Sequence, residues 1–218
     1  MSSRESTALL IFPCNGNGLE ALDCLGQLWH CVGFVDDTPE KQARGAYGYP
    51  VFPRAALTDL TAARVLAVPG GPTSYRSRRQ LIEGLGISPD RFARVIHPAA
   101  SVSSRATLGH NLLVMAGVVI TSNAVIGRHV CLLPNTVVHH DAVVGDWSLV
   151  GSNVTIAGGV VIGENCYVAT GSSITHGIRI GAGALVGIGS NVIRDVAAAA
   201  RVAGNPAIPL QAVGHPQR

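Results

Sequence analysis

The chain has 218 residues, of which 47% are hydrophobic and 13% are charged, and its formal net charge is +3. This composition argues against a disordered chain and against a protein that coats nucleic acid, and the length allows one or two domains. Five cysteines without a C-x-x-C pair argue against a disulfide framework, and no glycine-free apolar run is long enough for a membrane span. We therefore expect a cytoplasmic protein without nucleic-acid partners.

Residues 1–95 read as a small α/β domain with a Rossmann-like parallel sheet. Apolar runs predict buried strands at 9–12, 32–35 and 65–68, and helical spacing predicts helices at 20–28, 55–60 and 76–85. The first strand, the following turn and helix, and the second strand form one βαβ unit.

The turn after the first strand is rich in glycine and asparagine. It contains Asn15, Gly16 and Asn17, and the acidic pair Asp36 and Asp37 follows about twenty positions later, as a ribose contact would require. Pro13 replaces the first glycine of a dinucleotide fingerprint, which argues against a full NAD site. We predict that these five residues bind a phosphate or another polar part of the substrate. The alternative is a plain turn with solvated carboxylates.

Three arginines, Arg76, Arg78 and Arg79, lie on the last predicted helix of this domain. They are suited to an anionic acceptor, but a solvated helix face is the favoured interpretation.

From Ile96 to Val192, every sixth residue is aliphatic, seventeen times without a gap. A period of six is typical of a parallel β-helix in which three hexapeptides form one triangular coil, with coils about 4.8 Å apart. We expect a left-handed β-helix over 96–197, with glycine and asparagine at turns that need positive φ. Residues 198–218 are expected to form a C-terminal cofactor loop and tail. Flat, weakly charged prism faces favour a homo-oligomer.

Several stretches carry a family resemblance: the glycine-rich turn, Gly33–Asp37, Val95–Ala99, Val138–Gly145 and Ala203–Ala207. Together with the repeats they resemble the NeuD/PglD-type sugar acyltransferases. The resemblance implies a homotrimer that transfers an acyl group from acetyl-CoA, or another short acyl-CoA, to a sugar or nucleotide-linked sugar. It also implies residue roles: His140 and Asp141 as the catalytic pair, Gly158 at the oxyanion site, and Gly187, Ile188, Gly204, Asn205 and Pro206 along the cofactor.

An imidazole base fits acyl transfer from a thioester, because it can take the proton of the attacking amine or hydroxyl. A neighbouring carboxylate can fix its tautomer. His139 is the rival base, because adjacent side chains on an extended segment point in opposite directions. Leu149, Pro69 and Asn17 depart from the family pattern, so the acceptor, N- versus O-acylation and the acyl length stay open.

Two alternatives to an acyltransferase remain: a non-catalytic trimeric scaffold, and a metalloenzyme like the γ-class carbonic anhydrases. The second would need an H-x₄-H pair, which the sequence lacks. His140 and His176 fall on one edge but two coils apart, about 9.6 Å, which is too far to share one zinc ion. No metal site is therefore predicted.

Overall fold

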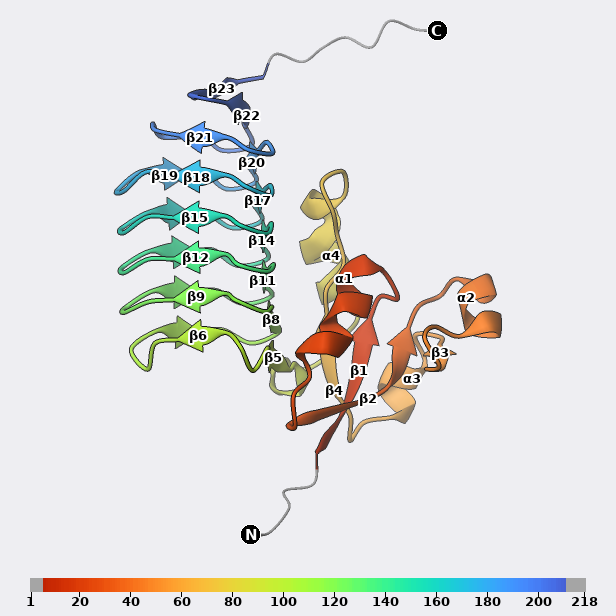
Figure 1. The fold of residues 1–218 in the computed structure, drawn as a ribbon. Helices are drawn as coiled ribbons and strands as arrows, with labels where there is room; N and C mark the ends of the chain where they lie inside the picture. Colours follow the sequence, from red (N-terminus) through yellow and green to blue (C-terminus); the bar gives the residue numbers. More distant parts are fainter. Residues whose placement is uncertain (1–5, 211–218) are drawn as a thin grey trace, which may run out of the picture.

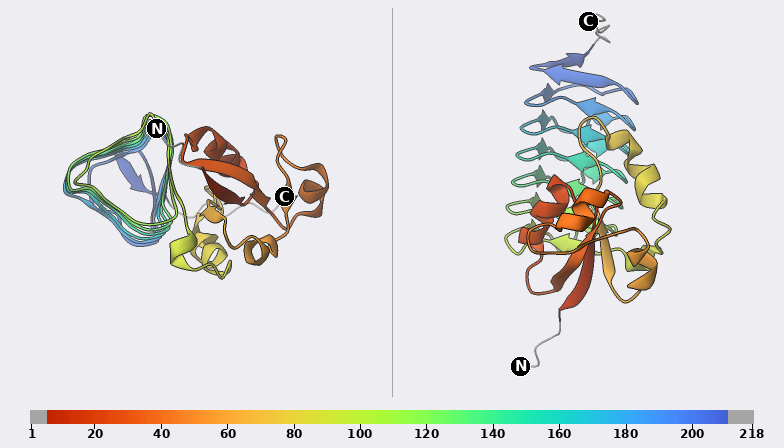
Figure 2. Two further views of the ribbon diagram at one scale, coloured as in Figure 1. Left: turned by 90° about the horizontal axis from the view of Figure 1, so that it is seen from below. Right: turned by 90° about the vertical axis from the view of Figure 1, so that its right-hand side faces the viewer.

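The computed structural model describes residues 6–210, which form a small α/β domain beside a tall triangular prism (Figure 1). Seen along its axis, the prism has three flat sides, and the N-terminal domain lies against one of them (Figure 2). The predicted fold class, a parallel α/β sheet followed by a β-helix of hexapeptide repeats, is confirmed. None of the helices in the described part of the chain is long and apolar enough to span a membrane.

The N-terminal sheet is parallel and has the strand order β3-β2-β1-β4. Its strands are β1 (Thr7–Phe12), β2 (Trp29–Val35), β3 (Val51–Phe52) and β4 (Arg64–Ala67). The run from Leu9 to Phe12 is apolar throughout because β1 is central and buried on both sides. The strands are added on one side of β1 up to β3, and β4 is then added on its other side, so the strand order reverses between β1 and β4. In open parallel sheets ligands bind at the carboxyl ends of the strands at such a reversal.

The helices of this domain are short. They are α1 (Gly16–Glu20), η1 (Ala21–Cys24), α2 (Pro39–Arg44), α3 (Ala56–Asp59), η2 (Tyr75–Ser77), α4 (Arg78–Glu83) and η3 (Pro89–Arg91). The helix expected at 20–28 instead begins at Gly16 and ends at Cys24 as a 3₁₀ turn. It begins earlier because the side chain of Asn15 accepts a hydrogen bond from the Gly18 amide and caps it.

The prism consists of three sheets whose strands are parallel, except that the last strand is antiparallel to the one before it. The first face contains β5 (Arg94–Ile96), β8 (Leu112–Val114), β11 (Cys131–Leu132), β14 (Leu149–Val150), β17 (Tyr167–Val168), β20 (Leu185–Val186), β22 (Arg201–Gly204) and β23 (Ala207–Pro209). The second face contains β6 (Ser101–Val102), β9 (Val119–Ile120), β12 (Val137–Val138), β15 (Thr155–Ile156), β18 (Ser173–Ile174) and β21 (Asn191–Val192). The third contains β7 (Thr107–Leu108), β10 (Val125–Ile126), β13 (Val143–Val144), β16 (Val161–Ile162) and β19 (Arg179–Ile180).

Consecutive coils pair residues eighteen apart, as in Val138 with Ile156, so the six-residue anchors stack into one buried column on each face. From residue 111 to residue 189, every sixth residue occupies a turn with φ between +53° and +73°. Most of these positions hold Asn or Gly, which accept the left-handed region at low cost. The prediction for the turns is thereby confirmed.

The C-terminal strands β22 and β23 continue the first face over 201–209, where the sequence suggested a loop. The remainder of the predicted tail, 211–218, lies outside the described residues.

The N-terminal domain covers the first face. Outward-pointing Leu113, Cys131 and Leu149 of this face are fully or almost fully buried, and they share a core with Leu9 and Phe34 of the N-terminal sheet. The edge of the prism opposite this face, between the second and third faces, therefore points away from the N-terminal domain of the same chain.

Candidate active site

His140 and Asp141 form a hydrogen-bonded pair on that distant edge, in the turn between β12 and β13. The Nδ1 atom of His140 lies 2.8 Å from Oδ2 of Asp141, and the side chains are 67% and 57% exposed. Asp141 has φ of +58° and its other oxygen, Oδ1, accepts a hydrogen bond from Asn123 Nδ2 at 3.1 Å. The hydrogen bonds from His140 and Asn123 lower the pKa of Asp141. An ionised carboxylate only accepts, so Nδ1 donates and Nε2 is left with a free lone pair.

Asn123 was not predicted as a site residue. It lies eighteen residues before Asp141, one coil below it, so the repeat register contained the signal for finding it.

His139 has a different environment. Its backbone amide donates to the Ile156 carbonyl, and its side chain is half-buried without a hydrogen-bond partner in the described part of the chain. Only His140 has a carboxylate to orient it.

Gly158 lies beside the imidazole in the next coil. A Cβ atom on Gly158 would be 2.6 Å from Nε2 and 2.7 Å from Cε1 of His140, so no other residue type fits without displacing the ring. Its amide makes no hydrogen bond to residues 6–210, whereas the amide of Gly159 donates to the His140 carbonyl. The edge thus presents a basic nitrogen and a free N–H donor close together.

Of the predicted cofactor residues, Gly158 lies beside His140, whereas the other five lie together on another edge, where the first face turns into the second. They are Gly187, Ile188, Gly204, Asn205 and Pro206. Ser190, which the sequence did not single out, joins them: its Oγ donates to the Gly187 carbonyl at 2.6 Å and accepts from the Gly204 amide at 3.2 Å. Gly187 packs so closely on Ala203 that a Cβ would lie 2.7 Å from the alanine methyl. Ile188 is 76% exposed beside this junction, and Asn205 and Pro206 form the turn of the β22–β23 hairpin.

The predicted acceptor residues Asn15, Gly16 and Asn17 lie in the N-terminal domain at the carboxyl ends of β1 and β4. Asn15 Nδ2 donates to the Val68 carbonyl at 3.4 Å, and Asn17 Nδ2 donates to the Gly70 carbonyl at 3.5 Å. These bonds join the turns after the two strands at the position where parallel sheets bind ligands.

Asp36 and Asp37 follow β2, and both carboxylates are already engaged. Asp36 is buried and accepts from the Thr38 amide at 3.1 Å, the Cys14 amide at 3.2 Å and Lys41 Nζ at 2.6 Å. Burial alone would raise the pKa of Asp36, but hydrogen bonds from Lys41 and Thr38 outweigh it and lower this pKa. Asp37 binds the amide and Nε of Arg54 at 2.9 and 3.1 Å.

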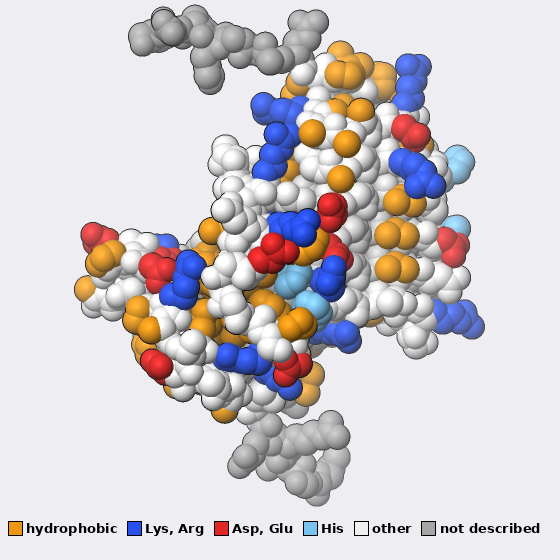
Figure 3. All heavy atoms as spheres, turned by 180° about the vertical axis from the view of Figure 1, so that it is seen from behind, with side chains coloured by type: hydrophobic (Ala, Val, Ile, Leu, Met, Phe, Trp, Pro, Cys, Tyr) orange, Lys and Arg blue, Asp and Glu red, His pale blue; other side chains and the backbone are white. Residues whose placement is uncertain are grey.

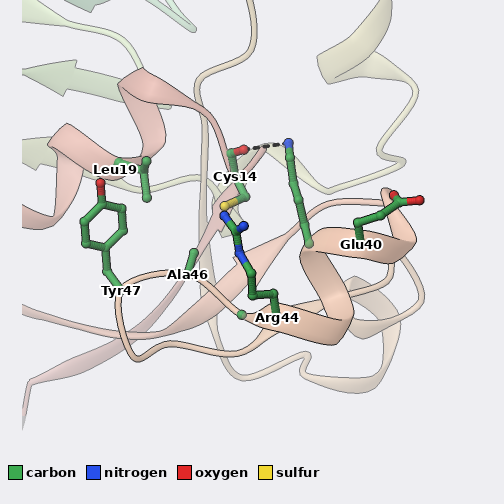
Figure 4. A pocket seen from close by; sticks show the side chains of 8 residues that line it. Cys14, Leu19, Glu40, Arg44, Ala46 and Tyr47 are labelled. Atoms are coloured by element: carbon green, nitrogen blue, oxygen red, sulfur yellow. Dashed lines mark hydrogen bonds between the residues drawn. The ribbon is translucent and has the colours of Figure 1, made fainter.

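Lys41 also donates to the Cys14 carbonyl at 2.7 Å and so becomes part of a cavity that the sequence did not indicate. The cavity has a volume of about 660 Å³, and side chains from the turn after β1, from α1, from α2 and from the 45–47 turn line it (Figure 4). Its lining residues are Cys14, Leu19, Glu40, Lys41, Arg44, Gly45, Ala46 and Tyr47. Lys41 is already paired with Asp36 and Glu40 also lines the cavity, so Arg44, which makes no ion pair within residues 6–210, is the cation left for a ligand. A cation beside an exposed tyrosine ring suits a ligand that carries both a negative charge and a planar group.

The solvated-face interpretation of the arginine cluster is right for Arg79 and wrong for Arg78. Arg79 is half-exposed and pairs with Glu83, whereas Arg78 is completely buried. The guanidinium of Arg78 donates to the carbonyl of Trp147 at 2.9 Å, to that of His129 at 2.7 Å and to that of Pro69. It therefore joins the N-terminal domain to the prism rather than facing an acceptor.

A second contact between the two parts surrounds His129. The ring of His129 stacks on Trp147, and its Nδ1 lies 3.0 Å from the side-chain nitrogen of Asn111. Asn111 in turn pairs with the backbone of Ala67 through both its amide oxygen and its amide nitrogen. Burial and the nearby cations lower the pKa of His129 to about 3, so the ring is neutral at physiological pH.

The described residues contain no group of three or more His, Cys, Asp or Glu side chains arranged to hold a metal ion. His140 and His176 occupy the same stack of turns with Gly158 between them, two coils apart as the register predicted.

Comparisons with known proteins agree with this architecture. The family model "Bacterial transferase hexapeptide (six repeats)" matches residues 123–158 and 141–176. PerB from Caulobacter crescentus, solved with CoA and GDP-perosamine, is 28% identical over 97% of this chain and 100% of that chain, with a TM-score of 0.81. Two further structures of that enzyme, each with one histidine replaced, also hold CoA and GDP-perosamine.

The acetyltransferase domain of PglB from Neisseria gonorrhoeae, solved with acetyl coenzyme A, is 27% identical over 94% of this chain and 100% of that chain, with a TM-score of 0.83. WeeI from Acinetobacter baumannii, at 23% identity over 94% of this chain and 100% of that chain, shares the fold with a TM-score of 0.78. The search of curated protein sequences found no match.

Proposed function

We propose that this chain, a hexapeptide-repeat protein that resembles the sugar N-acetyltransferases over nearly its whole length, transfers an acetyl group from acetyl-CoA to the amine of a nucleotide-linked sugar. The observation that carries the proposal is the His140–Asp141 pair with the free Gly158 amide beside it. A scaffold protein needs neither a carboxylate-oriented imidazole on an exposed edge nor a glycine at the position next to that imidazole in the following coil. The CoA and nucleotide-sugar complexes of PerB support the choice of both substrates.

His140 acts as the general base in this proposal. Its Nε2 accepts a proton from the amine as the nitrogen attacks the thioester carbonyl carbon, and Asp141 stabilises the imidazolium that forms. The Gly158 amide donates to the carbonyl oxygen as negative charge develops on it. The C–S bond then breaks, the CoA thiolate takes the proton, and the products are the amide and CoA. Acyl-CoA supplies the activated acyl group, so no covalent enzyme intermediate is needed.

The acceptor is proposed to bind the N-terminal domain at the carboxyl ends of its strands. Asn15, Gly16 and Asn17 form the turn there, and Asp36 acts indirectly by fixing Lys41 at the neighbouring cavity. Arg44 supplies positive charge for the diphosphate of a nucleotide sugar, and Lys41, held by Asp36, adds a hydrogen-bond donor beside it. Asp37 remains a proposed contact at the rim of this region, because it is exposed.

The three parts of the proposed site lie at separate places on one chain. The N-terminal domain covers the first face, whereas His140 lies on the opposite edge, and the predicted CoA residues lie on a third location. Histidine side chains stand on the edge farthest from the N-terminal domain, and apolar side chains line the neighbouring prism face in Figure 3. Outward-pointing Val125, Val143 and Val161 stack on the third face; Val125 is exposed and the other two are partly buried. We propose a homotrimer in which His140 of one subunit meets the CoA edge and the acceptor domain of its neighbour.

The first experiment measures acetyl-CoA binding and turnover for the wild type, His140→Ala and His139→Ala. Thermal stabilisation by acetyl-CoA at about a hundred times its Kd should be about 2.7 kcal/mol in all three proteins. Acetyl transfer to nucleotide-linked amino sugars should fall by about 10²–10⁴-fold in His140→Ala and stay near the wild-type value in His139→Ala. The proposal fails if acetyl-CoA gives no stabilisation, or if His140→Ala retains full turnover.

The divided site is tested by mixing subunits. His140→Ala and a second inactive variant, Lys41→Glu in the acceptor cavity, are unfolded separately and refolded together. Mixed trimers should contain sites with an intact histidine from one chain and an intact acceptor cavity from another, so activity should reappear. Recovery that does not exceed the two separately refolded variants would refute a site shared between subunits.

A further inference from the structure

A second cavity lies where the 72–76 segment of the N-terminal domain meets the upper coils of the prism. It has a volume of about 290 Å³ and is lined by Pro72, Thr73, Tyr75, Arg76, Leu185 and Arg201. Basic side chains gather at this junction in Figure 3. Two guanidinium groups and no carboxylate line the cavity, so it favours an anion.

The segment that forms one wall is firmly held. The hydroxyl of Tyr75 donates to the Gly183 carbonyl at 3.0 Å, and its ring packs on Tyr167 with centroids 5.7 Å apart. Arg76 Nη2 donates to the Ala199 carbonyl at 2.9 Å, and its own carbonyl accepts from Asn165 Nδ2 at 3.1 Å. The wall is thus preformed, and the positive charge of Arg76 is placed without being neutralised.

Arg201 forms the opposite wall. It lies on β22 directly across from Leu185 of β20, it is exposed, and its side chain makes no hydrogen bond or ion pair within residues 6–210. Gly187, predicted to border the cofactor, follows directly after β20 and lies two residues, or about 7 Å, from Leu185. The cavity therefore adjoins the proposed CoA edge.

The height of the cavity above the catalytic histidine matches the length of the pantetheine arm of CoA. Leu185 lies 45 residues, or two and a half coils, after His140, and Arg201 lies one coil higher, so the cavity is about 12 to 17 Å above the histidine. The pantetheine arm joins the thioester sulfur to the nearest phosphorus by about thirteen bonds, roughly 15 Å when extended at ~1.2 Å per bond. In a trimer of parallel prisms the coils of neighbouring subunits lie at the same heights, so a thioester beside His140 places the phosphates at the level of this cavity.

We propose that Arg76 and Arg201 bind the phosphate groups at the ADP end of acyl-CoA. The assignment rests on the proposed function. It adds the residues by which the enzyme would bind CoA more tightly than pantetheine, which lacks the phosphates. Arg201 binds phosphate directly, while Arg76 combines this role with holding the 72–76 segment in place.

The test compares acetyl-CoA with S-acetyl-pantetheine, which lacks every phosphate, in the wild type, Arg201→Gln and Arg105→Gln. Arg105 is an exposed arginine on the lowest coils, far from the cavity, and serves as the matched control. Loss of a charge-assisted phosphate contact should raise the KM for acetyl-CoA by about tenfold to a hundredfold in Arg201→Gln. The KM for S-acetyl-pantetheine and the kcat with either donor should stay at wild-type values. Arg105→Gln should change neither.

Direct binding measurements complete the experiment. Calorimetric titration with CoA and with 3′-dephospho-CoA shows which phosphate Arg201 contacts. If Arg201 binds the 3′-phosphate, removal of that phosphate and the Arg201→Gln substitution should each weaken binding, and the substitution should have no further effect on 3′-dephospho-CoA. If Arg201 binds the diphosphate, the substitution should weaken the binding of both ligands. If Arg201→Gln binds CoA as tightly as the wild type, or raises the KM for both donors equally, the assignment is wrong while the proposed function stands. A wild-type protein that binds no CoA refutes the proposed function itself.

Discussion

Replacing Gly158 with alanine should disable the active site without unfolding the protein. The added methyl would lie 2.6 Å from Nε2 of His140, about 1 Å inside an ordinary contact, so the imidazole must move by about that distance. A displacement of 1 Å in a catalytic group costs about 10²-fold in rate. We therefore expect kcat/KM for acetyl transfer to fall by about 10²-fold.

Stability should barely change in this variant. Gly158 does not have a left-handed backbone, and His140 is exposed and can rotate at a cost of about 0.5–1.5 kcal/mol. The smaller entropy of the unfolded alanine chain offsets about 0.4–1 kcal/mol of that cost. Gly86→Ala is the opposite control: with φ of +65° and open space around it, it should lose about 1–2 kcal/mol of stability and keep full activity.

Urea unfolding and steady-state kinetics on the same preparations separate the two effects. In a His140→Ala background, Gly158→Ala should cause little further loss, because the two residues act through one contact. An unchanged kcat/KM in Gly158→Ala would refute the idea that the position of the imidazole depends on the absence of a side chain at residue 158.

Three further predictions concern the site and the junction beside it. Asp141→Asn should lower kcat less than His140→Ala does, and pH–rate profiles should show its loss of imidazolium stabilisation, while an unchanged profile would contradict an orienting role. Arg78→Ala should lose at least about 3 kcal/mol in urea unfolding, since buried carbonyls left without a donor cost about 1–3 kcal/mol each, and exposed Arg79→Ala should lose at most about 1 kcal/mol. His129 is neutral when folded, so its contribution to stability is present above the ordinary histidine pKa and is lost as the pH falls from about 6.5 toward 3, by up to about 1.4 kcal/mol per pH unit. His129→Gln should flatten this decline, and an equally steep decline in both proteins would contradict the assignment.

The sequence predicted those parts of the molecule that its periodicity determines. The anchors from Ile96 to Val192 and the left-handed turns follow from steric rules that apply to each hexapeptide alone. His140 and Asp141 could be paired because they are neighbours in the chain. Asn123 could have been found from the repeat, because it lies eighteen residues, or one coil, before Asp141.

The contacts between the two parts of the chain had no such signal. Two of the three carbonyl partners of Arg78, on Trp147 and His129, are 69 and 51 residues away on the prism, and they come within reach only when the N-terminal domain docks. On a short amphipathic helix Arg78 looked like its exposed neighbour Arg79. Lys41 was missed for the same reason: it lies in α2, after β2, and its carbonyl partner Cys14 lies in the turn after β1.

The eighteen-residue coil restricts how this protein can change during evolution. A residue cannot be inserted singly without turning apolar anchors outward, so viable changes in prism height come as whole coils of about 4.8 Å. Adding one coil between β12 and β20 would lengthen the interval from the histidine to the Arg201 cavity by about four bonds of an extended arm. The pantetheine arm has the same length in every acyl-CoA. If Arg201 binds its phosphates as proposed, a prism with one coil more or fewer would no longer present the histidine and the cavity at the two ends of that arm.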